Sequence, residues 1–162
     1  MSNRISRSLL AAILFVATIA GPPTHASPSG DADLRELSRY TLTMADVNKY
    51  AAANANLAKH PKAEESEDEV GESDKESLDE MAARIGRIPE ARKAIEAAGL
   101  TPRQYAVITM ALFQAAFAQY AVEQGADIAK VASDAHVNPA NIRFVKEHKA
   151  ELDKLKETPE AE

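Results

Sequence analysis

The chain has 162 residues, no cysteine, and a formal net charge of −6 from 19 basic and 25 acidic side chains. That length suits one domain of ordinary size with a single buried core. The lack of cysteine excludes a disulfide framework, a thiolate metal site, a cysteine nucleophile and a lipid-modified N-terminal cysteine. The negative charge argues against nucleic acid or an anionic membrane surface as the natural partner.

Residues 1–26 have the composition of a secretory signal peptide. Arg4 and Arg7 precede an apolar run over residues 9–20, which is about as long as a signal core and too short to cross a bilayer. Small side chains end the segment, so we expect cleavage between Ala26 and Ser27. Cleavage removes two arginines and no acidic residue, and therefore changes the formal charge from −6 to −8. We expect the mature protein in the periplasm or outside the cell, without a membrane-spanning segment.

Glycine, proline and capping residues divide the rest of the chain into helical segments, and no stretch alternates apolar and polar residues as a strand does. The sequence predicts an all-α fold, a compact helical bundle of about five helices around a long central apolar helix. The expected segments are a polar leader with a short helix over 27–42, a first helix over 43–61, an acidic flexible linker over 62–76, a helical bundle core over 77–157 and a polar tail over 158–162. The linker is expected to be mobile because eight of its fifteen residues are acidic and it has little apolar surface to bury.

The segment 102–124 is the longest expected helix, and its middle is apolar on nearly every side. Thr101, Pro102 and Gln104 form a capping box with proline at the first helical position. A helix that is apolar all round is buried or lies in a membrane, and its glutamines and alanines favour burial. We therefore expect Phe113 and Phe117 in the core; if the helix instead offers one face to a partner, one of them would tolerate alanine in the isolated protein.

The same helix contains the candidate contact residues for a ligand or protein partner, which are Gln114, Phe117, Gln119 and Tyr120. Each glutamine lies among apolar neighbours and needs a hydrogen-bond partner if it is buried. At 100° per residue the two glutamines point about 140° apart, so they do not form one site. An apolar stripe of this kind most often belongs to a core.

No pattern of catalytic residues is visible. Of the three histidines outside the signal segment, only His148 has a carboxylate one turn away, Glu151, whereas a metal site needs three or four converging ligands. The chain has no Gly-x-Ser-x-Gly turn and no glycine-rich phosphate loop. We therefore expect no catalytic residue, no bound metal and no cofactor, and a protein that is not an enzyme.

Residues 131–145 contain the apolar spacing of a helix-turn-helix motif. Arg143, Lys146 and Lys149 would then be available for phosphates. His136 replaces the usual turn glycine, and both the negative charge and export oppose DNA binding. Two packed helices with a capped turn produce the same spacing.

Three segments resemble small exported bacterial proteins of uncharacterised function: Arg39-Tyr40-Thr41-Leu42-Thr43-Met44, residues 99–105 and residues 137–145. The resemblance implies a helical fold and brings no catalytic residue. The favoured interpretation is a non-catalytic binding protein of the cell envelope or secreted space, with an unknown protein or a small apolar ligand as partner. A helix-turn-helix DNA-binding protein over Val131–Val145 and a carrier of a small apolar ligand are the alternatives.

Overall fold

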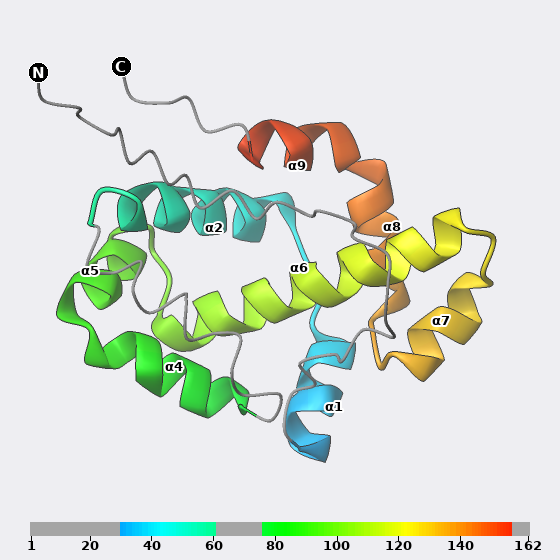
Figure 1. Ribbon diagram of the computed structural model, residues 1–162, viewed down its shortest axis with the longest axis horizontal. Helices are drawn as coiled ribbons and strands as arrows, with labels where there is room; N and C mark the ends of the chain where they lie inside the picture. The colour runs from blue at the N-terminus through cyan, green and yellow to red at the C-terminus, as the bar shows by residue number, and fades with distance from the viewer. Residues whose placement is uncertain (1–29, 61–75, 157–162) are drawn as a thin grey trace, which may run out of the picture.

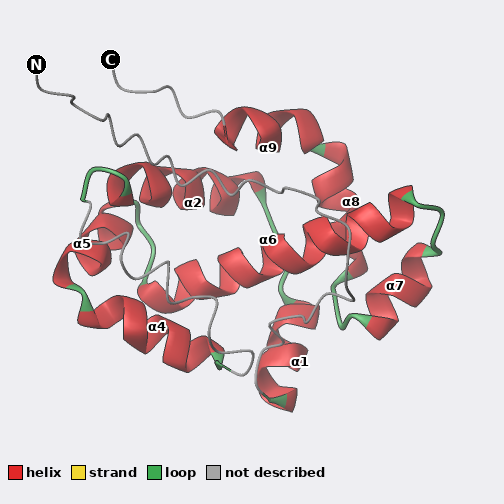
Figure 2. Ribbon diagram, in the orientation of Figure 1, coloured by secondary structure: helices red, strands yellow, loops and turns green. Residues whose placement is uncertain are grey.

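The computed structural model describes residues 30–60 and 76–156, and it is all-helical over those residues (Figures 1 and 2). The helices are α1 (Asp31–Arg39), α2 (Met44–Leu57), α4 (Leu78–Arg87), α5 (Pro89–Ala97), α6 (Pro102–Glu123), α7 (Ile128–Asp134), α8 (Pro139–Glu147) and α9 (Lys149–Lys156). The all-α prediction is confirmed. Among the described residues, seven helices accompany the long helix α6, where the sequence predicted about five around it.

Helix α6 crosses the molecule and contacts α1, α2, α4, α5, α7 and α8 (Figure 1). Its most extensive packing is against α4 in its first half and α8 in its second. Four of the nine buried residues of α6 are alanines, namely Ala106, Ala111, Ala115 and Ala118. Small side chains let the neighbouring helices approach α6 closely, so the core is built around this helix.

Three helices begin with capping boxes, one of which is the box predicted at Thr101. The hydroxyl oxygens of Thr43, Ser77 and Thr101 each accept a hydrogen bond from the backbone N–H three residues later. In return, the side chain at that third position accepts from the backbone N–H of the capping residue. These reciprocal bonds satisfy N–H groups that a helix leaves without partners at its start, and so fix where α2, α4 and α6 begin.

Three helices end in the same left-handed turn. Gly99, Gly125 and His136 have positive φ angles of 77°, 94° and 52°. In each case the next residue donates its N–H to a carbonyl five residues back, as in Val137 to Ala132 at 2.9 Å. This Schellman arrangement closes α5, α6 and α7. His136 adopts without a glycine the conformation that glycine adopts most readily.

The end of the predicted bundle core forms two helices. The chain between Pro139 and Lys156 carries no proline or glycine after its first position, which favours one continuous helix, but α8 ends at Glu147 and α9 begins at Lys149. His148 lies at the break with φ −101° and ψ 16°. Neither proline nor glycine marks this position. No local feature of the sequence therefore predicts this break.

The expected signal peptide, the first three residues of the leader, all of the linker except Glu76, and the polar tail lie outside the described residues. Glu76, which the sequence assigned to the flexible linker, is instead held beside α4. Its two carboxylate oxygens accept hydrogen bonds from Arg84 at 3.0 and 3.1 Å. Both side chains are largely buried, so Glu76 belongs to the packed structure just before the Ser77 cap.

Candidate interaction site on helix α6

Three aromatic side chains follow one another along one face of the second half of α6. Phe113, Phe117 and Tyr120 stand at positions i, i+4 and i+7, which lie on the same side of a helix. Phe113 is 41% exposed and Tyr120 is 52% exposed, while Phe117 is partly buried between them. We call these three residues the α6 aromatic stripe.

The exposure of Phe113 corrects the prediction that it belongs to the core. Next to Phe113, the neighbouring helices cover the opposite side of α6, where Ala111 and Ala115 are almost fully buried. Because α6 is apolar on nearly every side, the sequence alone could not indicate which side would be covered. A heptad spacing of aromatic residues is the one local signal that could have identified Phe113 as part of a surface.

The two predicted glutamine contacts lie in different surroundings. Gln119 is buried, with 5% of its surface exposed, and its Nε2 donates to Oε1 of Glu123 at 3.3 Å. Among the described residues, no group donates to the buried Oε1 of Gln119. Gln114 is partly buried on another side of the helix. The structure therefore keeps the two amides apart, as their spacing predicted, and only Phe117 and Tyr120 of the four predicted contacts belong to the stripe.

The C-terminal end of α6 is electrostatically linked to α9. The pKa of Lys149 is raised, first by its hydrogen bond to Asp153 at 2.9 Å and to a smaller extent by the negative charge of Glu123. The pair is solvent-exposed, so it adds little to stability. The positive charge of Lys149 on α9 therefore interacts weakly with the carboxylate of Glu123 at the end of α6.

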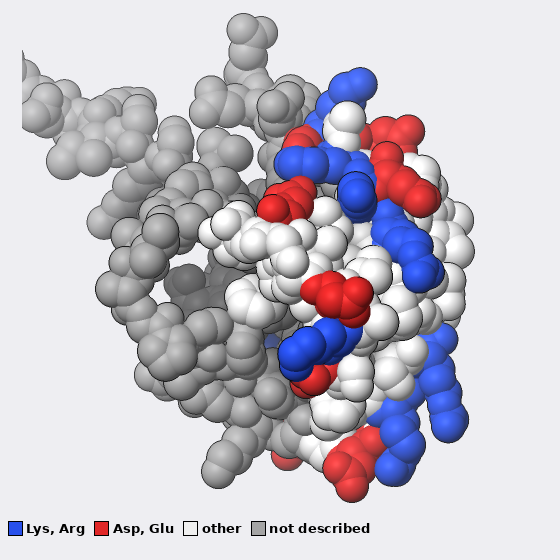
Figure 3. Space-filling view, turned by 90° about the vertical axis from the view of Figure 1, so that its right-hand side faces the viewer, with Lys and Arg blue, Asp and Glu red and all other residues white. Residues whose placement is uncertain are grey.

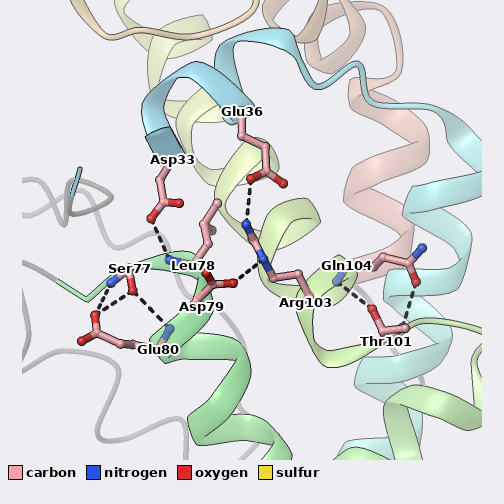
Figure 4. Close-up of polar contacts among 9 residues, drawn as sticks. All are labelled: Asp33, Glu36, Ser77, Leu78, Asp79, Glu80, Thr101, Arg103 and Gln104. Carbon is pink, nitrogen blue, oxygen red and sulfur yellow. Dashed lines mark hydrogen bonds and ion pairs between the residues drawn. The ribbon is translucent and has the colours of Figure 1, made fainter. Parts of the chain in front are cut away.

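A second polar cluster joins α1, α4 and α6, and its role is structural (Figure 4). Asp33 is buried, and its carboxylate accepts the backbone N–H of Leu78 at 2.9 Å, so α1 caps the start of α4. Arg103 donates to Glu36 and lies 2.7 Å from Asp79. These contacts tie three helix ends together. A guanidinium already held by two carboxylates is poorly suited to binding a further anion.

The helix-turn-helix segment forms two packed helices, α7 and α8, joined at the left-handed His136. Of the basic side chains, Arg143 and Lys146 are exposed on α8, while Lys130 on α7 pairs with Asp134 at 2.6 Å. On the face of the molecule at the α7 end, acidic and basic side chains are interspersed (Figure 3). Such a surface lacks the single-sign positive field that steers a protein to phosphates.

The histidines do not converge. His60 and His136 are exposed, and the Nδ1 of His148 lies 2.5 Å from a carboxylate oxygen of Glu151 while its ring leans on Phe144. Within residues 30–60 and 76–156, no three acidic or histidine side chains lie close enough to hold a metal ion. His148 therefore makes a local hydrogen bond to Glu151 on its own side of the molecule and belongs to no coordination site among the described residues.

Comparisons with known proteins found no relative of this chain. The chain matches no model of a protein family, and no curated protein or solved structure resembles it significantly. By length and composition, α6 is also apolar enough to cross a membrane, with half of its most apolar window buried inside the protein. The core helix of a soluble protein meets the same description, so this property does not change the assignment of α6 as a packed helix.

Proposed function

We propose that this protein is an exported, non-catalytic binding protein that contacts its partner through the α6 aromatic stripe. The supporting observation is the exposure of Phe113 and Tyr120 on a helix whose opposite side is buried. Aromatic side chains provide large contact area at low entropic cost, which is why they dominate protein interfaces. Because α6 is already held by six other helices, binding would require little ordering of the stripe.

The helix-turn-helix alternative has less support. The inward side of α8 is engaged by the α1–α2 connection, and the outward side presents Glu147 together with Arg143 and Lys146. A carrier of a small apolar ligand would be supported by a cavity beside the stripe. The exposed aromatic rings instead favour a partner that meets them at the surface.

Site-specific photo-crosslinking in the native host tests the binding function. A benzophenone amino acid replaces Tyr120, and in a matched control it replaces Ala129, which is exposed on α7. We expect a discrete crosslinked product from position 120, absent from position 129 and abolished by Phe113→Ala. Equal labelling at both positions, or a product indifferent to Phe113→Ala, would contradict a role for the stripe.

Export is proposed from the charge and apolar run of residues 1–26. Mass spectrometry of the protein from its native host should find Ser27 as the first residue of the extracytoplasmic species. A main species that retains Met1 would contradict export by this signal.

A further inference from the structure

No further inference is drawn: the strongest candidate, the α6 aromatic stripe with its exposed Phe113 and Tyr120, carries nothing because no contact among the described residues shows what covers that surface.

Discussion

The side-chain oxygen Oδ1 of Asn141 accepts a hydrogen bond at 2.8 Å from the backbone N–H of Leu42, a residue 99 positions earlier in the chain. The Nδ2 of Asn141 donates in turn to the carbonyl oxygen of Tyr40 at 2.9 Å. Asn141 is 1% exposed, so these bonds form away from water. The side-chain amide of Asn141 thereby gives hydrogen-bond partners to two backbone groups in the segment that joins α1 to α2. Neither α1 nor α2 provides partners for these groups.

Asn141→Ala should destabilise the protein by about 2–3 kcal/mol, because the buried N–H of Leu42 loses its acceptor. Urea unfolding followed by circular dichroism measures this change. Asn138→Ala is the control. Asn138 caps α8 and also donates to Tyr40, but it is less buried, so about 1 kcal/mol is expected. A smaller loss for Asn141→Ala than for Asn138→Ala would contradict the structural role of the buried amide.

The same contact joins two segments that are far apart in the sequence. Asn138 and Asn141, in the segment 137–145, both donate to the carbonyl oxygen of Tyr40, in the segment 39–44. These bonds hold the start of α8 against the connection between α1 and α2.

Local chemistry accounts for what could be predicted from the sequence. Capping boxes at Thr43, Ser77 and Thr101 and the glycines after α5 and α6 act within a few residues, so the helix ends that they define can be predicted from short stretches of sequence. The burial of Asn141 and the exposure of Phe113 depend on helices distant in sequence. An apolar helix such as α6 has no polar side that would indicate which face is exposed. The sequence therefore identified Phe117 and Tyr120 as contact residues but assigned Phe113 to the core.

Phe113→Ala should lower the free energy of unfolding by less than about 1 kcal/mol, because the side chain is substantially exposed and its removal opens no internal cavity. Ile108→Ala on the same helix is the matched comparison. Ile108 is almost fully buried, so a loss of roughly 2–5 kcal/mol is expected. Urea denaturation of both variants gives the two values. Similar losses would mean that Phe113 is a core residue and that the stripe is not available to a partner.

Replacing two glycines by alanine should change the stability of the protein in opposite directions. Gly86 lies inside α4, and a Cβ there would meet nothing within 4 Å, so Gly86→Ala should stabilise the protein by about 0.5 kcal/mol. Gly125 is equally open, but its φ of 94° belongs to the left-handed turn, so Gly125→Ala should destabilise by about 1 kcal/mol. Thermal unfolding of both variants measures the two changes in stability. Changes in the same direction would contradict the left-handed turn after α6.

His136→Gly should stabilise the protein by about 0.5–1 kcal/mol. The φ of 52° at His136 costs a residue with a Cβ roughly 1–2 kcal/mol, and the greater flexibility of glycine in the unfolded chain offsets part of the gain. His136→Ala is the control, because it removes the imidazole while keeping the Cβ. If alanine stabilises the protein as much as glycine does, the effect comes from the lost side chain and not from the backbone.

Tyr40 should make the protein lose stability at high pH. Partial burial, the negative charge of Asp46 and a hydrogen bond to Asp46 raise the pKa of Tyr40 from 10.0 to about 12. Below pH 10 the phenol is protonated in both the folded and the unfolded states. Above pH 10 the unfolded chain releases this proton while the folded protein keeps it, so the free energy of unfolding falls until the pH reaches about 12.

Tyr40→Phe isolates this effect, because it keeps the ring and removes the ionisable group. Urea unfolding of both proteins across pH 10 to about 12 should show a difference in stability that shifts steadily in favour of the variant. Absorbance titration of tyrosinate should show that the group lost in Tyr40→Phe is one that ionises late. A stability difference independent of pH over this range would mean that Tyr40 ionises as readily in the folded protein as in the unfolded chain. Its contact with Asp46 would then have no part in holding the start of α2.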